Sequence, residues 1–177
     1  TGGCGFIGSN LIRHLLSKKE EVICLDNFIT GNEKNIKDYL KNNLFQIINH
    51  DVTKPISLNV NKIWHLACPA SPSSYQSDPI KTAQTSFLGT YNMLNLATKF
   101  HAKFLLASSS EIYGNSIVDP QAEDYTGSVK TTGVRACYEE GKRISETLCS
   151  DFRRMHNTDV RIMRIFNTYG PFMRFDD

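Results

Sequence analysis

Residues 1–8, TGGCGFIG, decide the fold of this chain. The glycines at positions 3, 5 and 8 have the Gly-x-Gly-x-x-Gly spacing of a dinucleotide-binding turn, and Gly2 extends it. Glycine lacks a Cβ, so the backbone can approach a pyrophosphate, while Gly8 lets the next helix pack against the sheet. The pyrophosphate would lie at the N-terminus of that helix, where free N–H groups and the helix dipole favour negative charge.

The residues after the turn strengthen this interpretation. Residues 7–16 have helical apolar spacing, and the apolar run 22–25 ends at Asp26, about 20 residues after the turn. A carboxylate there accepts hydrogen bonds from an adenosine ribose and repels a 2′-phosphate, which predicts NAD rather than NADP. The alternative is a glycine-rich turn followed by a surface Asp. The predicted cofactor contacts in this part of the chain are Gly2, Gly5, Phe6, Ile7, Gly8, Asp26 and Asn27.

Short apolar runs alternate with helical patterns along the rest of the chain. We expect strands at 22–25, 45–48, 63–67, 104–107 and 160–165, helices at 7–16, 80–100 and 138–156, a polar helix at 32–40, and long loops at 68–79 and 115–136. Such alternation is typical of a parallel sheet covered by helices on both faces. The predicted fold class is therefore α/β, a Rossmann-like doubly wound parallel sheet.

Both ends of the sequence interrupt this pattern. A glycine turn of this kind usually follows a buried strand, yet here the sequence begins with Thr1 immediately before the turn. At the other end, residues 172–177 show no pattern of a final helix or strand. We expect residues 1–177 to be part of one NAD-binding Rossmann domain. The first strand and most of the C-terminal substrate region would be absent from it.

Composition excludes several classes of protein. The 177 residues carry a net charge of +2, which argues against a nucleic-acid partner or an acidic membrane surface. Five dispersed cysteines without Cys-x-x-Cys argue against a disulfide scaffold or a zinc site, and the five histidines are dispersed as well, so we expect no metal. A reducing, cytoplasmic location is expected, although a Golgi-type or other targeting segment could precede Thr1.

Further candidate cofactor contacts follow the expected strands. Asp51, with Val52 beside it, follows the second strand and could bond the adenine amino group; a solvated Asp at a strand end is the alternative. Leu66 and Ala67 end the next strand, at the carboxyl edge where ligands bind in open α/β sheets.

Tyr138 and Lys142 are four residues apart, on one face of an expected helix. An ammonium group near a phenol stabilises the phenolate, which can take a proton from an alcohol during oxidation. Lys142 could also hold the nicotinamide ribose, and both Tyr138 and Lys142 are predicted cofactor contacts. In isolation, a Tyr packed on a Lys stem is the commoner explanation of this spacing. The serine-rich strand end at 107–114 favours a catalytic role for the pair, because a hydroxyl there could hold a sugar hydroxyl beside Tyr138. The alternative is that these serines only form a turn.

Together these residues resemble the extended short-chain dehydrogenase/reductase family over nearly the whole chain. Within that family the sequence is similar to the UDP-glucuronate decarboxylases, also called UDP-xylose synthases. The segments that carry the similarity are HLACPASP (65–72), YQSDPIKT (75–82), SEIYG (110–114), RACYEEGKR (135–143) and RIFNTYGP (164–171).

The resemblance implies a reaction and roles for particular residues. In these enzymes NAD⁺ oxidises the sugar at C4, the neighbouring carboxylate leaves as CO₂, and the retained NADH reduces the ketone. Tyr138 would be the base with Lys142 as its partner, and Ser109 would hold the reacting hydroxyl. Glu111 would be the acid/base group near the decarboxylating carbon, where a protonated Glu could supply a proton; a Glu in a turn is the alternative. The implied substrate contacts are Pro69, Ser71, Tyr75, Ser110, Glu111 and Asn167.

Two other functions stay open at this point. An epimerase or dehydratase of the same family is the nearest alternative, although residues 69–72 and Glu111 favour the decarboxylase. The other alternative is a non-catalytic fragment that binds NAD only. The expected partners are a UDP-sugar substrate and, as in the family, a second copy of the chain that packs against the helices at 80–100 and 138–156.

Overall fold

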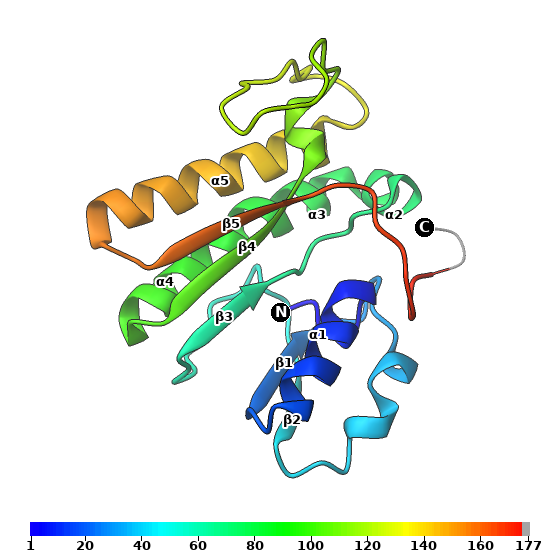
Figure 1. Cartoon of the computed structure of the whole chain (residues 1–177), viewed down its shortest axis with the longest axis vertical. Coiled ribbons are helices and arrows are strands. Elements are labelled where there is room, and N and C mark those ends of the chain that lie inside the picture. Colours follow the sequence, from blue (N-terminus) through cyan, green and yellow to red (C-terminus); the bar gives the residue numbers. More distant parts are fainter. Residues whose placement is uncertain (175–177) are drawn as a thin grey trace.

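The strands pair in parallel, as the sequence predicts (Figure 1). The computed structural model describes residues 1–174, so the last three residues of the C-terminal segment lie outside the described part. In one sheet β1 (Val22–Asp26) pairs with β2 (Phe45–Asn49); in the other, β4 (Lys103–Ser109) lies between β3 (Lys62–His65) and β5 (Val160–Ile165). Thr1 and Gly2 connect the sheets, because the Gly2 amide donates to Leu25 O (2.9 Å) and the Leu66 amide donates to Thr1 O (3.2 Å).

Helices cover both faces of β1. Successive side chains of a strand point to opposite faces of the sheet, so the contacts of Cys24 and Leu25 show what covers each face. Cys24 packs with Ile12 of α1 (Phe6–Ser17), whereas Leu25 belongs to the core cluster that contains Met93 of α4 (Thr90–Phe100) and Phe152 of α5 (Ala136–His156). The doubly wound arrangement is therefore confirmed. None of the helices within residues 1–174 is long and apolar enough to cross a lipid bilayer.

The helix expected at 80–100 is interrupted. It consists of α3 (Pro79–Gln84), a π-helical turn (Thr85–Gly89) and α4 in direct succession. A Cβ on Gly89 would lie 2.8 Å from the Cγ2 atom of Val52, so glycine lets the helix backbone pass close to the loop after β2. Single π-helical turns of this kind are frequent at functional sites.

Two other expectations for secondary structure were wrong. The polar helix at 32–40 is replaced by two short 3-10 turns, Glu33–Asn35 and Lys37–Tyr39. Ile36 between them is fully buried with φ −121°, because its side chain packs into the core cluster of α1 and β1. The loop expected at 68–79 contains a short helix, α2 (Pro72–Ser77), with proline in its first turn. Proline at that position is a helix-start signal that sequence reasoning passed over.

Substitution of Gly8 by Ala is expected to destabilise the fold. A Cβ on Gly8 would overlap the carbonyl oxygen of Gly2, and a backbone atom cannot move aside as a flexible side chain can. We expect the free energy of unfolding to fall by about 1–3 kcal/mol, measured by urea denaturation. Gly133→Ala is the matched control, since its Cβ would meet only ordinary contacts at 3.6 Å and beyond. Equal stability of the two variants would contradict the steric argument.

Candidate active site

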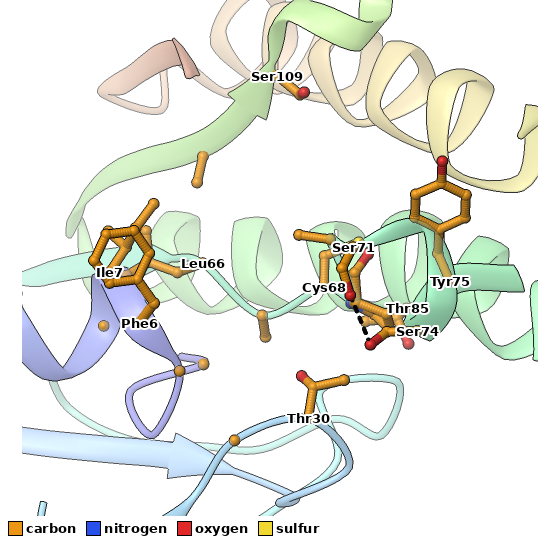
Figure 2. Close-up of a pocket in the computed structure, with 18 of the residues that line it drawn as sticks. Phe6, Ile7, Thr30, Leu66, Cys68, Ser71, Ser74, Tyr75, Thr85 and Ser109 are labelled. Carbon is orange, nitrogen blue, oxygen red and sulfur yellow. Dashed lines mark hydrogen bonds between the residues drawn. The ribbon is translucent and has the colours of Figure 1, made fainter. Parts of the chain in front are cut away.

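A cavity of about 550 Å³ opens at the carboxyl ends of the strands (Figure 2). Figure 2 shows Phe6, Ile7 and Leu66 grouped together, Tyr75 across the space from them, and Ser109 at the end of β4. Every predicted site residue except Asp51 contributes to the lining. Since the strands are parallel, their carboxyl ends meet at one edge, and this is why residues far apart in the sequence share the cavity.

The glycine turn leaves room at one end of this cavity. Gly2 has φ +69°, and a Cβ there would lie 2.8 Å from the backbone nitrogen of Ala67. Gly5 is the N-cap of α1, and a Cβ there would meet only Gly2 O, at 3.4 Å. The amides of the first turn of α1 therefore lie beside open space, which fits the phosphates of a dinucleotide.

Asp26 is held rigidly at the end of β1. Its carboxylate is 7% exposed and accepts hydrogen bonds from the backbone amides of Cys4 (2.8 Å) and Phe28 (2.9 Å). A carboxylate has about four acceptor positions, so these two bonds leave capacity for ribose hydroxyls. The position and chemistry of Asp26 therefore fit the adenosine end of the same cofactor.

Asp51 does not line the cavity but pairs with a residue that does. Lys81 Nζ lies 2.5 Å from Asp51 Oδ2 and 3.3 Å from Thr53 Oγ1. Partial burial raises the pKa of Asp51, but hydrogen bonds from Lys81 and Thr53 outweigh this effect and hold that pKa at about 2. The contact of Asp51 with adenine stays a prediction, and any such contact would share the carboxylate with Lys81. Sequence reasoning missed Lys81, although the Asp78-Pro79 helix start three residues earlier marks its place at the beginning of α3.

Tyr138 and Lys142 meet at one end of α5, as their spacing predicts. Lys142 Nζ lies 5.6 Å from the ring centroid of Tyr138 and donates to the carbonyl oxygen of Ala107 in β4 (2.8 Å). Both side chains are buried, at 6% exposure each. Burial lowers the pKa of nearby His65 well below its usual value, so His65 adds no positive charge beside Lys142 at neutral pH.

Ser109 and Glu111 lie where β4 ends. The Ser109 hydroxyl accepts a hydrogen bond from the Glu111 amide (3.2 Å), which fixes the turn after the strand. The Glu111 carboxylate pairs with Arg135, whose Nε lies 3.2 Å from Glu139 Oε1. Arg135 lines the cavity and was not among the predicted site residues, although it opens the segment RACYEEGKR. Glu111 is thus anchored by a cation from the residue just before α5.

The serine before Ser109 has a structural role. Ser108 donates to Glu146 Oε1 (2.5 Å), and Glu146 accepts two further hydrogen bonds from Arg164 of β5 (3.1 and 2.8 Å). The partly buried Glu146–Arg164 pair ties α5 to β4 and β5 beside the candidate catalytic residues. Neither residue was singled out from the sequence, because the pair joins two separate elements.

Residues 1–177 match the model of the NAD dependent epimerase/dehydratase family. The chain belongs to this family. Because the family is NAD-dependent, the expectation of NAD as the cofactor is confirmed.

Two curated relatives are similar to this chain over its whole length. It is 52% identical over 178 residues to UDP-glucuronic acid decarboxylase 6 of Arabidopsis thaliana, covering all of this chain and 52% of that protein. It is 48% identical to UDP-glucuronic acid decarboxylase 1 of Xenopus tropicalis, covering all of this chain and 42% of that protein. The chain thus spans about half the length of the curated relatives it matches.

A solved structure supports the fold. UDP-glucose 4-epimerase from Thermotoga maritima, determined with UDP-glucose, superposes with a TM-score of 0.81 at 25% identity, covering 97% of this chain and 55% of that one. The Rossmann-type fold of the epimerase/dehydratase family is therefore confirmed. The decarboxylases and this epimerase are each named for a UDP-sugar.

Asp26 is expected to set the preference between NAD and NADP. The parent protein should bind NAD at least about tenfold more tightly than NADP, since a carboxylate fixed at the ribose position repels a 2′-phosphate. Asp26→Ala should narrow that ratio, and Asp26→Asn should do so while keeping one acceptor for the neighbouring amides. Titration calorimetry with both dinucleotides measures the ratio. Glu33→Gln, which removes a carboxylate outside the cavity lining, is the control; equal affinities in the parent protein would refute the prediction.

Proposed function

We propose that this chain is the cofactor-binding part of a UDP-glucuronate decarboxylase, which converts UDP-glucuronate to UDP-xylose and CO₂. The observation that supports this most directly is the convergence of Ser109, Glu111, Tyr138 and Lys142 on one cavity. Close similarity to decarboxylases over the whole chain agrees with it.

The cofactor would be held at the glycine-turn end of the cavity. The backbone of residues 2–8 would bind the pyrophosphate, Asp26 with Asn27 would bind the adenosine ribose, and Leu66 with Ala67 would line the middle. Val52, which lines the cavity next to the paired Asp51, would lie beside the adenine. NAD, when bound, supplies a reversible hydride acceptor for oxidation at the sugar C4.

The chain's own residues would move the protons. The Tyr138 phenolate would take the proton of the C4 hydroxyl as that carbon is oxidised, and the positive charge of Lys142 would stabilise this phenolate before the transfer. Ser109 orients the same hydroxyl. The C4 ketone makes the substrate a β-keto acid, so the C5–carboxylate bond breaks to give CO₂ and an enolate. Glu111 would pass a proton from water to C5, and Tyr138 would return its proton to the C4 oxygen when the ketone is reduced.

The remaining proposed contacts would position the sugar nucleotide. Pro69 and Ser71 line the cavity from the segment before α2, and Ser110 and Asn167 line it from the segments after β4 and β5. Tyr75 also belongs to the lining, although its side chain is only 1% exposed. Its direct contact with substrate stays a prediction.

Incubation of the full-length protein with UDP-glucuronate tests the proposal. Mass spectrometry should show a product lighter than the substrate by one CO₂, without net consumption of NAD. An epimerised or dehydrated sugar would instead support the alternative activities of the same family. Solved structures of an epimerase and of a dehydratase share the fold of this chain. Tight binding of NAD without any product would identify a non-catalytic binding module.

The proposal also includes a second copy of the chain as partner. Large apolar side chains on the helices are partly exposed, including Phe87 (43%) and Tyr91 (44%) near the start of α4 and Ile144 (37%) on α5. They support a homodimer that packs through these helices. A cytoplasmic location and the absence of a nucleic-acid partner remain part of the proposal, and the five free thiols support a reducing compartment.

A further inference from the structure

The short helix α2 presents an aromatic ring to the candidate base. Tyr75 stacks on Tyr138 with ring centroids 5.0 Å apart and planes only 8° from parallel. Tyr75 is 1% exposed, so its ring is almost completely covered by neighbouring atoms, although the residue borders the cavity. The two rings come from segments 63 residues apart, and the stack is therefore a product of tertiary structure.

The backbone of Tyr75 is fixed by the helices on either side of it. Its carbonyl oxygen accepts from the hydroxyl of Thr82 in α3 (3.2 Å) and lies 3.6 Å from the donating thiol of Cys137 in α5. Its amide donates to the carbonyl oxygen of Ser71, the N-cap of α2 (2.9 Å). Cys137 directly precedes Tyr138, so these contacts tie α2 to the same turn of α5 that carries the base.

The hydroxyl of Tyr75 plays no part in this attachment. Within residues 1–174 it is the one buried side-chain polar atom that has no hydrogen-bond partner. A buried hydroxyl without a partner opposes folding, so the contacts that stabilise this side chain within the protein are those of its ring. Burial also raises the pKa of Tyr75, which keeps this phenol neutral next to Tyr138.

We propose that Tyr75 is a positioning residue, whose ring holds the ring of Tyr138 in the orientation that directs its oxygen toward the substrate. This inference rests on the proposed role of Tyr138 as the base. The Tyr138 oxygen lies on the axis of its Cβ–Cγ bond, so it moves only when the side chain turns about Cα–Cβ, and a flat neighbour packed against the ring opposes that swing. Small errors in the placement of a reacting group reduce rates strongly, so loss of the stack should slow turnover without weakening substrate binding.

Two substitutions of Tyr75 distinguish the contribution of its ring to turnover from that of its hydroxyl. In the full-length protein, Tyr75→Phe keeps the stack, so its kcat with UDP-glucuronate should stay at least about fivefold above that of a variant without the ring. Tyr75→Leu removes the ring and should lower kcat by ~10–10²-fold with KM changed less than about threefold. Tyr75→Met, which fills the space without a ring, replaces the Leu variant if that variant does not fold. An unchanged kcat in the ring-free variant, or an equal loss in Tyr75→Phe, would overturn the proposal.

A second measurement needs no turnover. In protein labelled with 3-fluorotyrosine, the ¹⁹F resonance of Tyr138 is assigned by its absence from Tyr138→Phe. Because the stacked ring shields Tyr138, the resonance should stay in place in Tyr75→Phe and move in the ring-free variant; an unmoved resonance would refute the stack as the positioning contact. If the parent protein does not act on UDP-glucuronate, the proposed function fails, whereas this spectrum still decides whether Tyr75 orients Tyr138.

Discussion

Replacement of Tyr138 by Phe is expected to reduce turnover of UDP-glucuronate by ~10²–10⁴-fold. The substitution keeps the ring, and with it the stack on Tyr75 and the position of Lys142 above the ring. It removes only the oxygen that would exchange a proton with the C4 hydroxyl. Because NAD binds chiefly through the glycine turn and Asp26 in this proposal, its affinity should be nearly unchanged.

Steady-state kinetics and calorimetry of the same preparation test both parts of this prediction. Tyr169→Phe is the control, because Tyr169 is 91% exposed and does not line the cavity. It removes an equivalent hydroxyl and should leave the rate unchanged. Full activity in Tyr138→Phe would remove Tyr138 from the mechanism, and a parallel loss of NAD binding would mean that its role is in holding the cofactor.

Replacement of Glu111 by Gln is expected to slow CO₂ release by at least ~10²-fold. Gln has nearly the same size and can still accept a hydrogen bond from Arg135, but it cannot exchange a proton with C5. Oxidation at C4 depends on Tyr138 and Lys142 and should be affected less, since it crosses a different barrier. The oxidised sugar with its carboxylate intact, together with reduced cofactor, should therefore accumulate.

Release of labelled CO₂ and the absorbance of reduced cofactor, followed in one experiment, separate the two steps. Glu139→Gln is a closely matched control: Glu139 contacts the same Arg135 but does not line the cavity. The Glu139 variant should release CO₂ at nearly the parent rate. If Glu111→Gln also does so, Glu111 is only a turn residue, and the case for a decarboxylase over an epimerase depends on residues 69–72.

Many of the predicted site residues that line the cavity belong to short local patterns. The glycine turn, Asp26 at the end of the first strand after it, and the pair Tyr138 and Lys142 each involve spacings that a helix or a strand end imposes by itself. The alternation of strands and helices then brings them together, because parallel strands place all their carboxyl ends at one edge. Nearly every predicted contact residue therefore lines one cavity.

Secondary structure was less predictable where packing decided it. The polar segment 32–40 has helical composition, yet the burial of Ile36 breaks it into two turns. The segment 68–79 was interpreted as a loop, although α2 forms within it because Thr82 and Cys137 anchor the backbone of Tyr75. At 32–40 contacts outside the segment outweigh its own propensity, whereas at 68–79 such contacts add to the helix-start signal of the proline.

The sequence by itself determined the parallel α/β fold, the cofactor-binding turn and the identity of the candidate base, since each depends on residues within one or two adjacent elements. Only the tertiary structure decided which side chains surround these groups. The pairing of Asp51 with Lys81, the anchoring of Glu111 by Arg135, and the stack of Tyr75 on Tyr138 join residues 24 to 63 positions apart. No periodicity in the sequence records such contacts, because they arise when the packing of α2, α3 and α5 against the sheet fixes the distances between separate elements.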